Sequence, residues 1–361
     1  MATMRDIAQR LGVSVGTVSK GLNGGTDISE ELRRSILDTA VELGYTNRRS
    51  QKEEHRKLAV FIENMDYQNV EDFGYEIILG FKTAANRDHW AVDIIEADRD
   101  FQNREKYETW MLQKGYSAGF FLGFSLEDPW IEQFHETSMP TALLDNYILL
   151  NPHVAMVGTD SEEAMDLAIG HLRSLGHEKI AFLNGSAHSY ISDQRMISYL
   201  SSMARHHLHI DPSIAVYGYY VAEAAGYHVP GFLQKGVTAI LCGNDRIAEG
   251  VIRCCKASGY SVPEDISVVG FDDIPLAQRL DPPLTTIRQS RSELGRCGYY
   301  TLYSMISGVA VSRNLLRPSL VVRETTTIAR PRIATGHPEE KDSVLSVNPD
   351  LYKSFAIQRT L

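Results

Sequence analysis

This sequence has few cysteines, no long apolar run and no excess of positive charge, and each of these features excludes a class of protein. Its 361 residues include four cysteines, Cys242, Cys254, Cys255 and Cys297, without a CxxC pair, so a disulfide framework is not expected. No stretch approaches the ~18 consecutive apolar residues that a membrane-spanning helix needs. The first eleven residues are charged and lack the apolar centre of a secretion signal. These features favour a reduced, cytoplasmic protein that does not associate with a membrane.

The charge balance excludes a protein that simply coats nucleic acid, because 36 basic residues face 46 acidic ones and the net charge is −10. The charge is unevenly distributed, however. Residues 1–57 carry 10 basic and 8 acidic side chains, whereas the rest of the chain carries 26 and 38. This asymmetry indicates two modules with different roles, and a length of 361 residues favours two or three domains.

The first module has the pattern of three short helices. Thr3 is placed to cap a helix over 4–11, and Ser14 to cap a second helix over 15–22. A third helix is predicted to start at Ser29, with two glutamates in its first turn, where the helix dipole favours acids. Three short helices, with a glycine between the first two, are typical of a helix-turn-helix.

After a polar, basic-rich connector over 45–57, short apolar runs alternate with helical patterns. The runs predict buried parallel strands and cover residues 58–62, 119–122, 141–144, 180–183, 239–241 and 266–269. Helical patterns lie between them, for instance over 73–90, 164–175 and 246–258. This alternation predicts an α/β protein built as two doubly wound subdomains. From residue 336 onward the chain is polar and its role cannot be inferred.

Several sequence blocks recur in the order of a known family. They are residues 3–8, 12–20, 22–23, 42–45, 171–172, 175–177, 243–245, 262–273 and 283–289. Over about nine-tenths of the chain these blocks resemble the lactose-repressor (LacI/GalR) family. The resemblance implies a small all-α helix-turn-helix head and a two-lobed, doubly wound α/β core similar to periplasmic sugar-binding proteins.

The resemblance also implies domain boundaries. We expect a DNA-binding head over 1–46, a hinge or connector over 47–57, a core for effector binding and dimerisation over 58–330, and a tail of unknown role over 331–361. Within the core, the chain is expected to cross between the lobes near 157–160, 285–289 and 318–321.

The second helix carries side chains suited to DNA recognition. Short hydrogen-bonding residues such as Ser14, Thr17, Ser19 and Asn23 suit contacts to phosphates, as their family counterparts do. Val15 and Gly16 stand where the family varies its base contacts, and Lys20, where Arg is usual, can donate to guanine O6 and N7. On spacing alone, a small helical bundle with a solvated polar face would fit equally well; the downstream blocks make it less favoured. The predicted DNA contacts are Thr3, Arg5, Ser14, Val15, Gly16, Thr17, Ser19, Lys20, Asn23, Arg48 and Arg49.

The connector departs from the family pattern of a proline followed by a hinge helix with a leucine that wedges into the minor groove. Asn47 replaces the proline, and Glu54 stands at the leucine position. A carboxylate is repelled by phosphates and cannot replace an apolar wedge. We therefore expect Arg48, Arg49 and Lys52 to contact phosphates instead, with weaker bending of the operator centre.

Carried over by position, a set of polar and aromatic residues faces a ligand cleft between the lobes. The predicted effector contacts are Glu63, Phe73, Tyr75, Asp145, Arg195, Tyr220, Asn244, Asp272, Gln289 and Arg291. Carboxylates, amides and a guanidinium suit a polyhydroxylated ligand, because each hydroxyl both donates and accepts, and the aromatic members could stack on it. As an alternative, Asn244 and Asp272 could merely cap helices. Arg291 departs from the family and suggests either an anionic group on the ligand or a salt bridge to Glu63.

Other constellations are weak. His206, His207 and His209 lack a matching cluster at metal-ligand spacing, so a solvated loop is favoured over a metal site. Asp272 and Asp273 lack the glycine-rich loop of a Mg²⁺-nucleotide site, and no catalytic triad has supporting context. We therefore expect no cofactor, no metal and no enzymatic activity.

The sequence as a whole predicts a DNA-binding transcriptional regulator, most often a repressor in such relatives. We expect it to act as a homodimer on double-stranded operator DNA under the control of a small polar effector, most simply a sugar or sugar derivative. A regulator controlled by a docking co-regulator protein is the alternative within the family. A solute-binding protein is less favoured, because it would need a secretion signal and no head.

Overall fold

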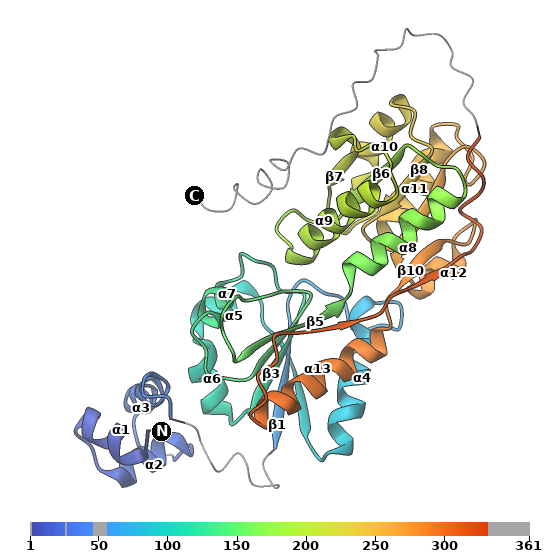
Figure 1. The fold of residues 1–361 in the computed structure, drawn as a ribbon. Helices are drawn as coiled ribbons and strands as arrows, with labels where there is room; N and C mark the ends of the chain where they lie inside the picture. Colours follow the sequence, from blue (N-terminus) through green and yellow to red (C-terminus); the bar gives the residue numbers. More distant parts are fainter. Residues whose placement is uncertain (1, 26, 46–55, 331–361) are drawn as a thin grey trace.

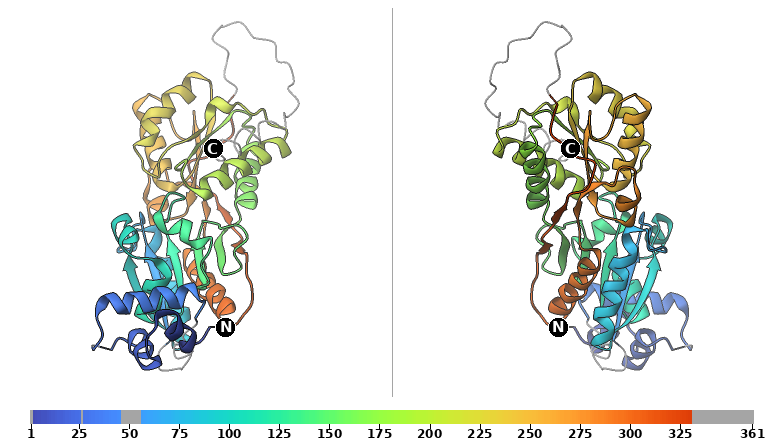
Figure 2. Two further views of the ribbon diagram at one scale, coloured as in Figure 1. Left: turned by 90° about the vertical axis from the view of Figure 1, so that its left-hand side faces the viewer. Right: turned by 90° about the vertical axis from the view of Figure 1, so that its right-hand side faces the viewer.

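A helical head and two α/β lobes follow one another along the molecule in the computed structural model, which describes residues 2–25, 27–45 and 56–330 (Figure 1). Two sheets, one in each lobe, one parallel and one with a single antiparallel edge strand, confirm the predicted fold class. In both views of Figure 2 the head lies at the end of the first lobe that is remote from the second lobe. No helix among the described residues is both long and apolar enough to cross a bilayer.

The head consists of the three predicted helices, α1 (Met4–Leu11), α2 (Val15–Leu22) and α3 (Glu30–Glu42). The expected caps are present: Thr3, Ser14 and Ser29 each accept a hydrogen bond from a backbone amide in the first turn of the helix that follows. Thr3 also forms a reciprocal capping box with Asp6. Packing around a small apolar centre holds the helices together; its fully buried members are Ile7, Val18, Ile36 and Ala40.

The first lobe, called the N-lobe below, is built on a parallel sheet with the strand order β11-β5-β4-β3-β1-β2. Its strands are β1 (Lys57–Ile62), β2 (Ala91–Glu96), β3 (Ala118–Leu122), β4 (Thr141–Leu144), β5 (Val154–Thr159) and β11 (Arg313–Leu316). One face is covered by α4 (Phe73–Arg87) and α13 (Arg291–Ile306), and the other by α5 (Arg99–Arg104), α6 (Tyr107–Lys114) and α7 (Pro129–Phe134) (Figure 1).

Glycine permits the close crossing of α4 and α13. A Cβ added to Gly80 would lie 2.1 Å from the carbonyl oxygen of Ser292, and one added to Gly295 would lie 1.8 Å from that of Ile77. Any side chain at either position would therefore force the two helices apart.

The second lobe, the C-lobe, has the strand order β12-β10-β9-β8-β6-β7, in which only β12 runs antiparallel to its neighbour. Its strands are β6 (Ile180–Asn184), β7 (Ala215–Tyr217), β8 (Ala239–Cys242), β9 (Ser267–Asp272), β10 (Thr285–Arg288) and β12 (Ser319–Val321). One face packs on α8 (Ser161–Ser174) and α9 (Tyr190–Arg205), and the other on α10 (Ala224–Gln234), α11 (Asp245–Ala257) and α12 (Pro275–Arg279); a short 3₁₀ turn, η3 (Pro212–Ile214), precedes β7.

The chain passes between the lobes three times, from β5 to α8, from β10 to α13 and from β11 to β12. The predicted strands and helices are all present, and their ends differ by at most three residues from those predicted. The predicted helix over 73–90, for example, ends at Arg87.

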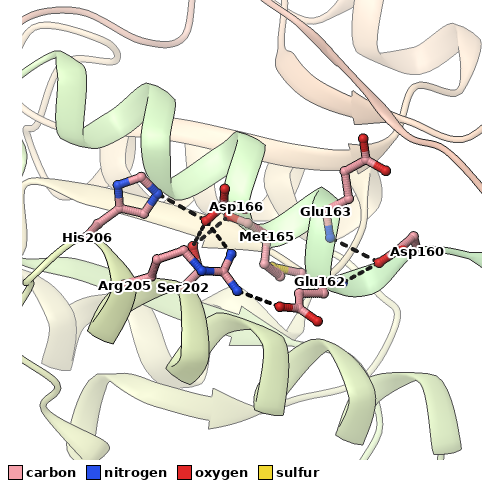
Figure 3. A network of polar contacts seen from close by, with 8 residues as sticks. All are labelled: Asp160, Glu162, Glu163, Met165, Asp166, Ser202, Arg205 and His206. Atoms are coloured by element: carbon pink, nitrogen blue, oxygen red, sulfur yellow. Dashed lines mark hydrogen bonds and ion pairs between the residues drawn. The ribbon is translucent and has the colours of Figure 1, made fainter.

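A polar network joins α8 to α9 on the surface of the C-lobe (Figure 3). Asp160 caps α8, and Arg205 donates to both Glu162 and Asp166. The Nε2 atom of His206 lies 3.1 Å from the Asp166 carboxylate. One of the three clustered histidines is thus part of this network, and no three potential ligands among the described residues form a metal site.

Candidate DNA-binding and effector sites

The recognition helix α2 presents its variable positions to solvent. Val15 exposes 43% of its surface, and Gly16 and Lys20 are also exposed, while Val18 is buried against the rest of the head. Thr17 is half-buried beside the N-cap Ser14, and their hydroxyl oxygens lie 2.9 Å apart. The exposed face of α2 is therefore available to a groove of DNA.

Local hydrogen bonds hold the polar side chains in and beside α1 and α2. The Asn23 amide donates to the carbonyl oxygen of Ser19 over 2.7 Å and lies 3.3 Å from its hydroxyl. Thr3 belongs to the capping box of α1, and Arg5 is exposed. The other predicted DNA contacts, Arg48 and Arg49, lie outside the described residues, as do Asn47, Lys52 and Glu54 of the atypical connector.

Lys20 forms an ion pair with Asp27, in the turn between α2 and α3. Both side chains are more than half exposed, and the hydrogen bond from Lys20 lowers the pKa of the Asp27 carboxyl. Sequence reasoning did not single out Asp27. The available signal was a carboxylate seven residues after a predicted base contact, but sequence spacing alone does not show that the intervening turn folds back.

The head packs against α6 of the N-lobe. The hydroxyl of Thr109 donates to the carboxylate of Asp38 over 2.7 Å, and Leu112 joins the apolar centre of the head. Arg34 donates to the backbone oxygen of Arg104 over 3.3 Å. The DNA-binding module therefore contacts the lobe whose strand ends carry part of the predicted effector site.

Four predicted effector residues come together at the carboxyl ends of the strands, and we call them the interlobe cluster: Asp145, Arg195, Asp272 and Gln289. Asp145 follows β4 of the N-lobe, whereas the other three belong to the C-lobe or to its exit toward α13. The Gln289 amide donates to the Asp272 carboxylate over 2.7 Å. Arg195 donates to the carbonyl oxygen of Gly243 over 2.8 Å, and its guanidinium lies 3.9 Å from the centre of the Phe271 ring.

Burial governs the electrostatics of this cluster. Arg195 and Gln289 each expose only 3% of their surface. Burial raises the pKa of the Asp145 carboxyl to about 6, against the opposing effect of the Arg195 charge. Burial likewise raises the pKa of Asp272, which is opposed by Arg195 and by the hydrogen bond from Gln289.

Three buried atoms of the cluster have no hydrogen-bond partner among the described residues: Asp145 Oδ1, Arg195 Nε and Gln289 Oε1. A buried polar atom without a partner costs roughly 1–3 kcal/mol. Two acceptors and one donor, drawn from both lobes, suit a ligand that donates and accepts hydrogen bonds.

Asn244 caps α11, the role that the alternative interpretation of the sequence predicted. Its side-chain oxygen accepts from the backbone amide of Ile247 over 2.8 Å, and its amide nitrogen lies 3.4 Å from the carbonyl oxygen of Tyr220. The hydroxyl of Tyr220 lies 2.6 Å from that of Ser192. An effector contact by Asn244 or Tyr220 remains a prediction.

The two other predicted aromatic contacts lie on the N-lobe. Phe73 packs partly into the apolar core beneath α4, and Tyr75 is exposed in the first turn of that helix. Among the described residues neither ring stacks on another aromatic side chain. Their stacking role also stays a prediction.

The suggested salt bridge between Arg291 and Glu63 is wrong. Arg291, only 5% exposed, lies 3.2 Å from a carboxylate oxygen of Glu76 and donates to the carbonyl oxygen of Asp72 over 3.1 Å. The side chain joins the first turn of α13 to the start of α4, because those two helices cross there. Arg291 is therefore no argument for an anionic group on the ligand.

Glu63 lies at the end of β1 beside a cavity of about 540 Å³ at the carboxyl ends of β1 and β2. It exposes only 9% of its surface. Burial, reinforced by the charges of Asp128 and Asp98, raises the pKa of its carboxyl to about 7. Among the described residues, its hydrogen-bond partner is the neighbouring side-chain amide of Asn64, which donates over 3.2 Å.

Direct contacts bridge the lobes at two further places. Arg279 of α12 donates to both carboxylate oxygens of Glu71, which precedes α4. At the second place, a ring nitrogen of His188 lies 2.9 Å from the Glu127 carboxylate, and the backbone amide of Leu126 donates to the carbonyl oxygen of His188 over 3.2 Å. These contacts join the lobes in the arrangement seen here.

Comparison with known proteins gives both modules a match. Residues 3–47 match the model for bacterial regulatory proteins of the lacI family, and residues 169–326 match a periplasmic binding protein-like domain. The HTH-type transcriptional repressor CytR of Escherichia coli strain K12 is 28% identical over 334 residues, which span 90% of this chain and 96% of CytR.

Two solved structures share the whole arrangement. A complex of the transcriptional regulator CelR with cellobiose is 25% identical, with a TM-score of 0.67, over 90% of this chain and 100% of that one. The lac repressor dimer bound to operator and the anti-inducer ONPF is 26% identical, with a TM-score of 0.63, over 90% of this chain and 99% of that one.

A helix-turn-helix head joined to a two-lobed, periplasmic-binding-protein-like core defines a DNA-binding transcriptional regulator. The matched relatives are regulators and not enzymes. The head of this chain matches the lacI family, and relatives that match about 90% of its length are transcriptional regulators, among them the repressor CytR.

Proposed function

We propose that the chain binds a near-palindromic operator as a homodimer and that a small polar effector, a sugar or sugar derivative, binds at the interlobe cluster and changes its affinity for operator. The observation that carries the proposal is the set of three buried, unpartnered atoms on Asp145, Arg195 and Gln289. A polyol supplies both the donors and the acceptors that these atoms require.

Coupling to DNA follows from the two-lobed origin of the cluster. Asp145 belongs to the N-lobe, whereas Arg195 and Asp272 belong to the C-lobe, so a ligand that contacts all three favours one relative position of the lobes. A ligand that bound every relative position of the lobes with the same affinity would not change the affinity for operator, however tight its binding. The head packs on α6 of the N-lobe, which makes its placement sensitive to movement of that lobe.

On the DNA side, we propose that Val15, Gly16 and Lys20 contact base edges and that the short polar residues around them contact phosphates. The exposure of these three positions on α2 supports this division. One short helix covers only a few base pairs, so useful affinity requires two half-sites related by a protein two-fold axis.

The test is the selection of bound DNA from a random pool with the full chain, with and without a panel of neutral hexoses and disaccharides. We expect enrichment of a near-palindromic site and a change in its retention with at least one sugar. Enrichment of a single half-site would refute the dimer. A response to a phosphocarrier protein and to no sugar would refute the effector and favour the docking co-regulator.

A further inference from the structure

The mouth of the cavity beside Glu63 is unusually acidic. Five carboxylate side chains line it, from the ends of β1 and β2 and from the loop before α4: Glu63, Asp66, Asp72, Glu96 and Asp98. No Lys or Arg is among its described lining residues. A volume of about 540 Å³ is within the usual range for small-molecule sites, roughly 300–1,000 Å³.

Three of these five carboxylates already accept hydrogen bonds from nearby backbone amides or hydroxyl groups. Asp72 accepts from the backbone amide of Asn69 over 2.8 Å, and Glu96 accepts from the hydroxyl of Tyr67, also over 2.8 Å. Asp98 caps α5.

Glu63 differs from its neighbours. It is buried, it meets the negative charges of Asp98 and Asp128, and its only partner among the described residues is the neutral amide of Asn64. The charge of Arg99 opposes this effect on the pKa of Glu63, but Arg99 is engaged with Asp128 at 3.4 Å and with the backbone oxygen of Glu127. A buried carboxylate without a cation is costly unless another group supplies the positive charge.

A second, independent observation points to a ligand with hydrogen-bond donors at the same edge. Asp145 follows β4 and Glu63 follows β1, two strands further along the same parallel sheet, so both lie at its carboxyl edge. Asp145 Oδ1 and Gln289 Oε1 are buried acceptors without a donor among the described residues, and Gln289 is 97% buried. Arg291, the cation that the sequence placed here, is bound to Glu76 instead.

A metal ion fits this set poorly. Among the described residues no three carboxylate, histidine or cysteine side chains converge in a metal-binding arrangement. An organic cation, in contrast, needs only one carboxylate at the position of its charge and neutral acceptors for its hydroxyls.

We infer that the effector is an amine-bearing carbohydrate whose protonated amino group binds Glu63 while its hydroxyls bind the interlobe cluster. This inference rests on the proposed function, because it assigns a chemical class to the same effector. An ammonium group provides three donors and a positive charge, and charge-assisted hydrogen bonds are roughly twice as strong as neutral ones. Glu63 is then the residue that distinguishes an amino sugar from the parent sugar.

The test uses calorimetry on the full chain with three matched sets of sugars: glucose, galactose and mannose, their 2-amino-2-deoxy analogues, and the N-acetyl forms of those analogues. We expect at least one amino sugar to bind ten-fold or more tightly than both its neutral counterparts. Glu63→Gln, which keeps the side-chain size and the contact to Asn64, should remove that preference. Glu96→Gln is the matched control, since Glu96 lines the same cavity but is satisfied by Tyr67.

Each other outcome overturns a stated part of the two proposals. A parent sugar that binds as tightly as its amine, and is lost in Asp272→Asn, overturns the amine inference and leaves the proposed effector site standing. A preference for the amine that survives Glu63→Gln overturns the role of Glu63. If none of the nine sugars binds, the inference and the sugar assignment both fail. The thermal melting curve of Glu63→Gln, compared with that of the parent protein, serves as the check on folding.

Discussion

Asp272→Asn should separate effector binding from stability, because Asp272 is both a proposed ligand acceptor and a buried carboxyl group. Asparagine preserves the size of the side chain and an oxygen that can accept from Gln289. It also tolerates the backbone at this position, where φ is +110°, better than most residues do. The substitution therefore removes the charge and little else.

The expected loss of effector affinity follows from the charge. A hydrogen bond to an ionised acceptor contributes roughly 1.5–3 kcal/mol, so its loss should weaken binding about 10- to 150-fold. Titration calorimetry of the full chain with the identified effector measures this change. An unchanged dissociation constant would refute the assignment of Asp272 to the site.

Stability should move in the opposite direction. Burial raises the pKa of Asp272 in the folded protein above its unfolded value, so the ionised carboxyl costs stability as the pH rises through the folded pKa. Asp272→Asn should therefore melt at the same temperature as the parent protein near pH 4 and at an equal or higher temperature near pH 7. Asp273→Asn is the matched control: its carboxylate pairs with Arg288 and Arg323, so this variant should lose stability and keep its effector affinity.

Three further predictions concern the head, the N-lobe and the bridge between the lobes. Lys20→Ala should relax the preference at one base position by about 1–3 kcal/mol, whereas Thr17→Ala should weaken all sequences alike; a binding-site scan measures both, and the reverse pattern would contradict the docking assumed here. Gly295→Ala should lower the free energy of unfolding by about 1–3 kcal/mol in denaturant titrations, because the added Cβ overlaps a backbone oxygen of α4. Gly226→Ala, where a Cβ meets nothing within 4 Å, is its control and should be neutral or stabilising. Arg279→Gln should weaken the bidentate bridge to the N-lobe and lower effector affinity by up to about five-fold, the worth of an exposed ion pair; an unchanged affinity would mean that this bridge does not favour the ligand-bound arrangement.

The sequence predicted local features well, because their causes are local. The caps at Thr3, Ser14 and Ser29 each involve a residue three positions further along, so their pattern is visible in the chain. The strands of both lobes were equally visible, since a strand buried on both faces is apolar along its whole length.

The partners of polar side chains were harder to predict, because they depend on contacts between distant elements. Arg291 meets Glu76 only because α13 and α4 cross at their first turns, more than 200 residues apart in the chain. Asp27 meets Lys20 only because the turn after α2 folds back. Nothing in residue type or spacing distinguishes these pairs from the many others that the chain offers.

The late position of α13 and β11 in the chain has a consequence for biosynthesis. The N-lobe sheet and the helix α13 that covers one of its faces are incomplete until residue 316 has been made, although β5 ends at residue 159. At about 5–20 residues per second, the ribosome needs roughly 7–26 s to add the 130 or so residues between β5 and α13. During that interval the apolar surface formed by Phe81 and Phe120 lacks its cover from Tyr299. The nascent N-lobe then exposes an apolar face to which chaperones can bind. A stop codon anywhere before residue 313 would leave both lobes without an edge strand.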